Sequence, residues 1–197
     1  MSISPVVPRV FVLLALLVLS GCLSTPLSSL PKLARLDFLT MNFAEVRAGL
    51  RQPSALALRP GDFVMTVKTK TEGSSDETVD RFVLVEAAEP AERHPLSMEA
   101  KPGFVLSVWR IAPEDVPRLA AIQERTRVSI KYGPRVRGSI EIAVTGGCVR
   151  EDIPAGPLPV STYLKPARDE SFITLSANAD LRGMITGKDR QVSLPRC

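Results

Sequence analysis

Short runs of alternating apolar and polar residues, separated by turn sequences, constrain the fold of this 197-residue chain more than any other feature. In residues 63–70, the side chains of Phe63, Met65 and Val67 fall on one face, and threonine and lysine dominate the other. Such alternation predicts a strand with one buried face. A turn sequence at residues 72–76 and a second strand at residues 79–86 follow. We therefore expect a β-hairpin.

Further strands are predicted along the rest of the chain. Residues 104–111 are strongly apolar and do not alternate, which indicates a strand buried on both faces. Residues 42–51 fit a helix face and a strand face equally well. Gly49 and Pro53 disfavour a long helix there, so we favour a strand. The remaining predicted strands are residues 127–132, 136–144, 160–164 and 172–175.

One helix is predicted near residues 115–125. Asp115 is a suitable N-cap, Pro117 is tolerated in the first turn, and Leu119 and Ile122 begin an apolar stripe. Short strands, frequent turns and a single helix indicate a mainly β (α+β) fold. We expect an antiparallel β-sandwich or an open barrel with the helix laid against it.

The N-terminal region contains ten consecutive apolar residues, 10–19, after a single basic residue, Arg9. A membrane-spanning helix needs about 20 residues, so this run is too short to be one. It fits the hydrophobic region of a secretory signal peptide. Two small residues, Ser20 and Gly21, then lead directly to Cys22.

The sequence Leu19-Ser20-Gly21-Cys22 resembles the lipobox of bacterial lipoproteins, and this resemblance covers residues 1–22. It implies cleavage before Cys22, a thioether-linked diacylglycerol on its sulfur and acylation of its amino group. The alternative is an ordinary signal peptide with a chance cysteine near the cut. Leu23 stands where an Asp often retains such proteins in the inner membrane, so the resemblance implies the outer membrane, with the domain facing the periplasm.

The chain is accordingly divided into a signal peptide (1–21), a lipidated tether (22–37) and a single β-rich domain (38–197). Serine, threonine and proline are frequent in the tether, where Pro26 and Pro31 interrupt any helical period. The alternative is that its leucines at positions 27, 30, 33 and 36 dock on the domain. The residues of the domain itself indicate no characterised family.

Two cysteines, Cys148 and Cys197, remain in the exported part of the chain. An even pair in an oxidising compartment predicts a disulfide, and two free thiols are the alternative. Two cysteines and one histidine, widely separated, make a poor zinc site, so we predict no metal and no cofactor.

No catalytic residue is predicted. The single histidine, His94, lies in an expected loop and is accompanied by no G-x-S-x-G motif. Glu86, Glu89 and Glu92 are three residues apart, but such spacing along a loop fixes no geometry. The hydroxyls of residues 161–163 are equally well explained by the preference of Thr and Tyr for strands.

Basic residues are concentrated between positions 125 and 137, where no acidic residue occurs. Over the whole chain, 25 Lys and Arg face 21 Asp and Glu, a balance too mild to indicate nucleic-acid binding. If residues 127–132 and 136–144 pair as strands, a basic patch forms that would meet anionic headgroups or an acidic partner. The alternative is a solvated face that protects a sheet edge. The basic residues are Arg125, Arg127, Lys131, Arg135 and Arg137.

These features favour a membrane-anchored envelope lipoprotein that acts as a non-catalytic binding or assembly module. Its partners would be the membrane, through the N-terminal lipid, and either an envelope protein or anionic lipid. One alternative is an envelope enzyme that uses carboxylate or hydroxyl groups not recognisable from sequence, and another is a structural spacer. A deep pocket lined by Glu and by Ser, Thr or Tyr would favour the enzyme.

Overall fold

A computed structural model describes residues 25–153, 155–182 and 194–197. The predicted signal peptide, the lipobox and Cys22 lie outside the described residues. The structure therefore concerns the predicted domain and residues 25–37 of the predicted tether.

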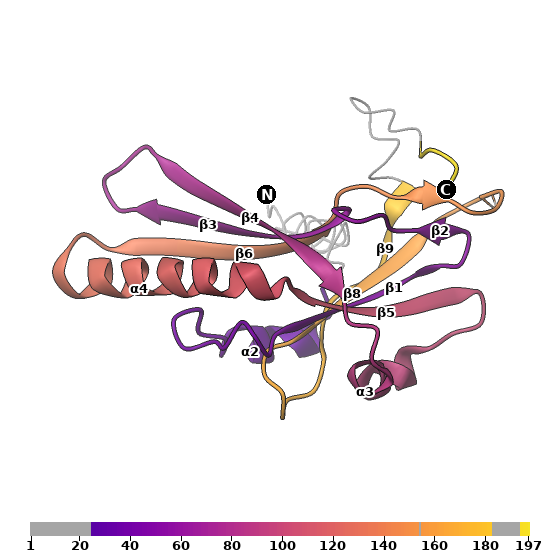
Figure 1. The fold of residues 1–197 in the computed structure, drawn as a ribbon, viewed down its shortest axis with the longest axis horizontal. Helices are drawn as coiled ribbons and strands as arrows, with labels where there is room; N and C mark the ends of the chain where they lie inside the picture. Colours follow the sequence, from indigo (N-terminus) through magenta and orange to yellow (C-terminus); the bar gives the residue numbers. More distant parts are fainter. Residues whose placement is uncertain (1–24, 154, 183–193) are drawn as a thin grey trace, which may run out of the picture.

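Seven antiparallel strands form one sheet in the order β6-β3-β4-β5-β1-β8-β9, which curls into a half-barrel (Figure 1). The predicted mainly β fold is thus confirmed, in its open-barrel form. The strands are β1 (Arg47–Pro53), β3 (Phe63–Thr71), β4 (Glu77–Glu86), β5 (Phe104–Ile111), β6 (Val136–Val144), β8 (Pro159–Lys165) and β9 (Ile173–Asp180). A separate pair consists of β2 (Leu56–Ala57) and β7 (Cys148–Val149).

The predicted hairpin is present, with β3 paired to β4 from Val64–Val83 to Lys70–Glu77. Its turn contains Gly73 at a φ of 84°, a left-handed conformation that glycine adopts without steric cost. Together with β6, this hairpin extends away from the other strands (Figure 1).

The concave face of the sheet carries the main hydrophobic core. The residues predicted to share one face of β3 are buried there, and Leu119 and Ile122 of the helix pack against them. Phe63 meets Trp109 of β5 edge-on, with ring centroids 5.6 Å apart. Val108, the neighbour of Trp109, belongs to a second buried cluster. The predicted burial of β5 on both faces is therefore confirmed.

The helix α4 spans Val116–Tyr132, after a short 3-10 turn at Pro113–Asp115 (η4), and is longer than predicted. The predicted strand at residues 127–132 is wrong, because those residues continue the helix. Val128, Ile130 and Tyr132 alternate with polar residues in the sequence but are 47%, 49% and 75% exposed. The alternation therefore does not mark a buried face of a sheet. The helix ends at Tyr132, since Pro134 disfavours helical backbone at Gly133, the residue before it.

Short helices cover two other parts of the sheet. The loop expected around His94 contains α3 (Pro90–Arg93) and η3 (His94–Glu99), and Leu96 is buried against the convex face. Within the predicted tether, η2 (Leu27–Ser29) and α2 (Leu30–Leu33) lie near β9. None of the helices in the described ranges is long and apolar enough to cross a membrane.

A disulfide joins Cys148 of β7 to Cys197, with their Cα atoms 4.9 Å apart, in agreement with the predicted pairing. Backbone hydrogen bonds strengthen this attachment. The amide of Val149 donates to the carbonyl of Pro195 at 2.8 Å, and the amide of Cys197 donates to the carbonyl of Val149 at 3.1 Å. Residues 194–197 are thereby fixed to β7.

Candidate ligand-binding cavity

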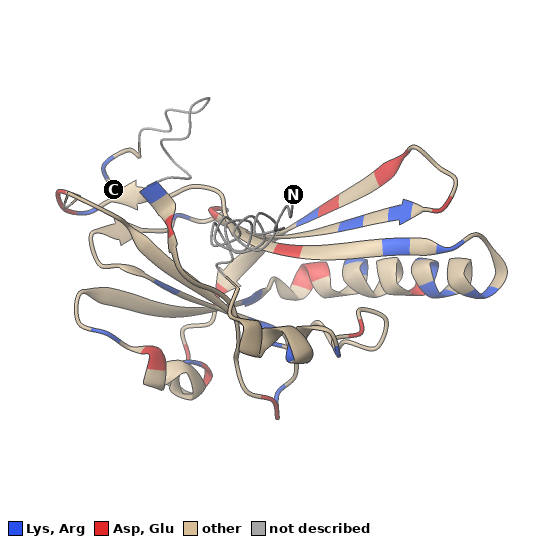
Figure 2. Cartoon of the chain, turned by 180° about the vertical axis from the view of Figure 1, so that it is seen from behind, with Lys and Arg blue, Asp and Glu red and all other residues tan. Residues whose placement is uncertain are grey.

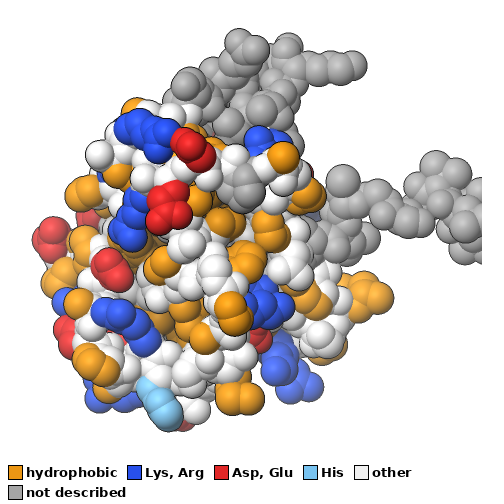
Figure 3. All heavy atoms as spheres, turned by 90° about the vertical axis from the view of Figure 1, so that its right-hand side faces the viewer, with side chains coloured by type: hydrophobic (Ala, Val, Ile, Leu, Met, Phe, Trp, Pro, Cys, Tyr) orange, Lys and Arg blue, Asp and Glu red, His pale blue; other side chains and the backbone are white. Residues whose placement is uncertain are grey.

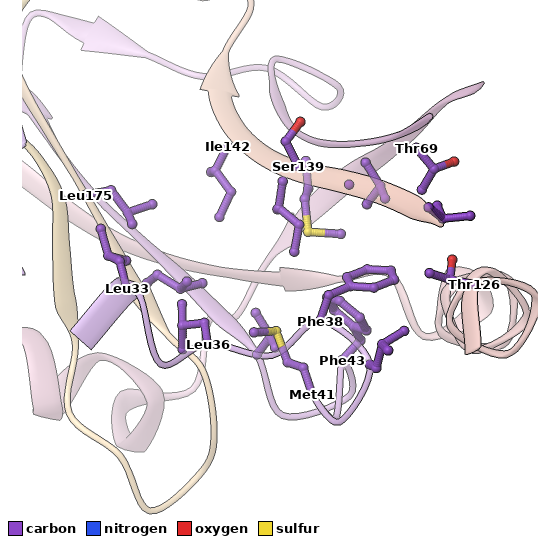
Figure 4. Close-up of a pocket in the computed structure, with 18 of the residues that line it drawn as sticks. Leu33, Leu36, Phe38, Met41, Phe43, Thr69, Thr126, Ser139, Ile142 and Leu175 are labelled. Carbon is purple, nitrogen blue, oxygen red and sulfur yellow. The ribbon is translucent and has the colours of Figure 1, made fainter. Parts of the chain in front are cut away.

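A cavity of about 460 Å³ lies between the concave face of the sheet, helix α4 and the segment 33–46 (Figure 4). Pockets that bind small molecules typically measure roughly 300–1,000 Å³. The cavity is therefore large enough to accept a small ligand.

The sheet wall of the cavity follows from the register of β3 and β6. The pairs Met65–Ile142 and Val67–Ile140 place four apolar side chains on the concave face. The next pair on this face is Thr69–Gly138. A Cβ atom at Gly138 would lie 3.3 Å from the carbonyl oxygen of Lys68, so even a small side chain would be tight there. Glycine at position 138 keeps this end of the cavity wide.

The opposite wall is formed by the segment between α2 and β1. Its apolar side chains Leu36, Phe38 and Met41 line the cavity (Figure 4). Gln123 of α4 holds the segment by donating from Nε2 to the carbonyls of Phe38 and Met41, at 2.6 and 2.8 Å. Arg127 adds a hydrogen bond from Nη2 to the carbonyl of Leu39 at 2.9 Å. Thus α4 fixes the position of this wall relative to the sheet.

The lining is almost entirely apolar. Thr126 donates its hydroxyl to the carbonyl of Ile122 at 2.8 Å, so that group is satisfied within the helix. Ser139 pairs with Lys68 on the convex side, and its hydroxyl points away from the cavity (Figure 4). Thr69 lies at the α4 end of the cavity. The described lining residues include no Asp, Glu, Lys, Arg or His.

The two ends of the cavity differ in exposure. Leu33 and Leu175 lie at one end, and both are partly buried (Figure 4). At the other end, Ile130 of α4 and Ile140 of β6 are 49% and 37% exposed although they line the cavity. We call this exposed end, formed by Ile130 and Ile140, the open end.

The predicted basic residues lie near the open end but not on two paired strands. Arg125, Arg127 and Lys131 are on α4, Arg135 directly precedes β6, and Arg137 is the second residue of β6 (Figure 2). Arg137 pairs with Lys70, on the face opposite the cavity. Arg127 forms an ion pair with Glu124. The structure brings the five residues to one end of the molecule without placing them on one surface.

The glutamates considered as acid–base candidates do not line the cavity. Glu92 accepts from Arg47 at 2.7 Å, and Glu89 lies 3.8 Å from Arg110. The Arg47 guanidinium holds the pKa of Glu92 below its usual range, although partial burial opposes this shift. His94 begins η3 and is exposed.

The hydroxyls of residues 161–163 divide between the two faces of the sheet, and those of Ser161 and Tyr163 join a network on the face opposite the cavity. The buried Arg51 donates to Ser161 at 3.0 Å, to Asn178 at 3.1 Å and to the carboxylate of Glu99 at 2.9 Å. Tyr163 donates its hydroxyl to the same carboxylate at 2.8 Å. Burial, together with this hydrogen bond, raises the pKa of Tyr163 to about 12. The network links β1, β8, β9 and η3, and so has a structural role.

Metal binding has no support in the described part of the chain, where no group of three or more His, Cys, Asp or Glu side chains could hold an ion. Comparison with protein-family models, curated proteins and solved structures found no match to this chain.

Sequence reasoning missed the cavity because its wall is assembled from segments far apart in the chain. One signal was present. Residues 33–43 contain six closely spaced large apolar side chains, where the predicted tether (22–37) meets the predicted domain (38–197). Such a density of apolar residues indicates a segment that packs against something. These residues are Leu33, Leu36, Phe38, Leu39, Met41 and Phe43.

Proposed function

We propose that this chain is a lipid-anchored envelope protein whose domain binds an apolar ligand in the half-barrel cavity. The observation that carries the proposal is a cavity of about 460 Å³ with no charged side chain among the described residues that line it. Transfer of an apolar ligand from water into such a site is favourable, at roughly 25 cal/mol per Å² of apolar surface buried. The wall offers few polar groups that an apolar ligand would leave without a partner.

The envelope location rests on two independent features. The lipobox resemblance at residues 19–22 implies export and a lipid on Cys22. The pairing of Cys148 with Cys197 fits an oxidising compartment such as the periplasm. With Leu23 after the cysteine, the proposed site is the outer membrane, with the domain facing the periplasm.

Binding is favoured over catalysis because general acid–base chemistry requires a titratable group within hydrogen-bond reach of the reacting atoms. The described wall of the cavity supplies none. Two of the glutamates considered for an envelope enzyme form ion pairs elsewhere, Glu92 with Arg47 and Glu89 with Arg110. The cavity thus supports a binding module for an apolar partner or ligand.

The anchor is tested by mass spectrometry of the mature N-terminus isolated from membranes. We expect an acylated cysteine at position 22 and loss of stable membrane attachment in Cys22→Ser. Recovery of unmodified Cys22 from native membranes would contradict this part of the proposal.

The cavity is tested in the full chain carrying Cys22→Ser, so that no attached lipid can occupy it. Binding of the fluorescent apolar probe N-phenyl-1-naphthylamine is measured by titration. We expect Ile140→Asp to weaken probe binding by about tenfold or more, because it brings an unpaired charge to the apolar wall. Ile140 is partly exposed, so the substitution should leave the fold intact, as circular dichroism would show.

The matched control is Ser139→Asp, which adds the same charge one residue away on the opposite face of β6. We expect it to bind the probe like the parent chain. Absence of probe binding in the parent, or equal binding by both variants, would refute the assignment of the cavity as the binding site.

A further inference from the structure

We propose that the occupant of the cavity is a single-chain anionic lipid of the fatty-acid type. Its hydrocarbon chain would lie in the cavity, with its anionic headgroup at the open end, beside Lys131 and Arg127. This inference rests on the proposed function and adds the chemistry and the orientation of the ligand.

The orientation follows from the exposure of the lining residues. The floor of the cavity is formed by deeply buried side chains such as Val46 and Met65, which are suited to a hydrocarbon chain. Water reaches the lining at Ile130 and Ile140. A ligand with one charged end must keep that end in water or paired, because an isolated buried charge is costly. The headgroup therefore belongs at the open end.

The volume favours one chain over two. At about 460 Å³, the cavity lies in the lower half of the range for small-molecule pockets, roughly 300–1,000 Å³. The side wall is also fixed by the three hydrogen bonds from Gln123 and Arg127 to the segment 38–41. A lipid with a single slender chain fits these dimensions best.

Cationic side chains follow one edge of α4 to the open end. Residues four apart are neighbours on a helix surface, so Gln123, Arg127 and Lys131 form a row. The first two bind the carbonyls of the cavity wall, and Lys131 lies one turn beyond the last of these contacts. Its ammonium lies 4.9 Å from the centre of the Tyr132 ring, which is itself largely exposed. Lys131 is thus placed where the wall ends and the solvent begins.

The charge of Lys131 is not cancelled by a neighbouring carboxylate. Glu124 pairs with Arg127, whereas Lys131 has no carboxylate within 4.0 Å among the residues the structure describes. Residues 125–137 contain no acidic side chain. The carbonyl end of α4 carries a partial charge of about −0.5, which the full charge of Lys131 exceeds. The open end is therefore electrostatically complementary to a singly charged anionic headgroup.

Laurate and dodecanol test the inference, because they share a chain length and differ in headgroup charge. Each is titrated as a competitor against N-phenyl-1-naphthylamine bound to the full Cys22→Ser chain, at low salt and at a pH where laurate is ionised. We expect laurate to compete at a severalfold lower concentration than dodecanol. In Lys131→Gln, the laurate concentration that displaces half of the probe should rise by about three- to fivefold, which corresponds to the free energy of an exposed ion pair. The dodecanol concentration that displaces half of the probe should not change.

The matched control is Arg125→Gln, which removes one positive charge from a different face of the same helix, six residues before Lys131. It should change laurate competition by about twofold or less, since a charge off the binding edge acts on the headgroup only across water, whose high dielectric constant weakens the interaction. The advantage of laurate should also shrink as salt is added.

Equal competition by laurate and dodecanol, or equal losses in Lys131→Gln and Arg125→Gln, would overturn the inference and leave the apolar-ligand function standing. If the probe binds but neither lipid competes, the occupant is another apolar group, such as side chains of a partner protein, and the inference is again wrong. If the probe itself does not bind, the proposed function fails and the inference fails with it.

Discussion

The two halves of the sheet use similar strands in different ways. In the closed half, formed by β1, β5 and β8, both faces are covered: Leu50 is buried on the concave side, and Val108 packs with Leu96 of η3 on the convex side. In the open half, formed by β3, β4, β6 and α4, one face is largely in water, and Val79 and Val83 are exposed. The closed half contributes stability, whereas the open half contributes access to the cavity.

The surface of the molecule reflects the same division. Seen from the end opposite α4, charged side chains of both signs are dispersed among apolar ones (Figure 3). At the α4 end, exposed apolar side chains adjoin basic residues and the entrance of the cavity. Both faces of the sheet are covered in the closed half, and only one face is covered in the open half. The molecule can therefore combine a stable core with a site for an apolar ligand.

The largest expected contrast comes from truncating one aliphatic side chain in each half. Leu50→Ala should lower the free energy of unfolding by about 2–5 kcal/mol, because it opens a cavity in a fully packed core. Ile130→Ala should cost less than about 1 kcal/mol, since half of that side chain is already in water. Urea denaturation of both variants measures the difference. Equal costs would show that the two halves do not differ in packing.

The disulfide should matter for stability and not for the cavity. Its sequence separation of 49 residues gives a chain-entropy stabilisation of about 4 kcal/mol. Reduction should therefore lower the Tm, and Cys197→Ser should lower it similarly, with no added effect of reductant. Probe binding well below the Tm should persist, because neither cysteine lines the cavity. Two free thiols in the native, oxidised protein would contradict this expectation.

A smaller effect is expected from Tyr163, which belongs to the closed half. Its pKa is raised to about 12, so the fold favours the neutral phenol. The stabilisation is complete below the unfolded pKa of about 10 and is lost as the pH rises toward 12. In Tyr132→Phe, where Tyr163 is the remaining tyrosine, ultraviolet titration should show ionisation near pH 12. Ionisation near pH 10 in the folded protein would show that the phenol is not held in the Arg51 network.

Most strands of both halves were predictable from the sequence, whereas the second half of α4, in the open half, was not. Residues 104–111 lacked alternation because Val108 and Trp109 are buried on opposite faces of a fully covered strand. Residues 127–132 alternated by chance, since all three of their large apolar side chains are exposed. The spacing of apolar residues indicates secondary structure only where those residues pack into a core.

The cavity itself could not be derived from the sequence. The residues of its walls are brought together by the curl of the sheet and by hydrogen bonds from Gln123 and Arg127 to backbone carbonyls of residues 38–41. Backbone carbonyls are present at every position, so such contacts leave no pattern in the sequence. The basic residues between 125 and 137 were identified, but their placement depended on a helix where a strand was expected.

The central claim, that an apolar ligand lies in the cavity of the open half, is tested most directly by methyl NMR during a laurate titration. The two buried clusters provide the comparison. We predict shift changes at the cavity methyls of Ile140, Ile142 and Leu175, with Leu96 and Leu106 on the opposite face unchanged. Changes confined to Leu96 and Leu106, or no saturable changes at any of these methyls, would contradict the claim.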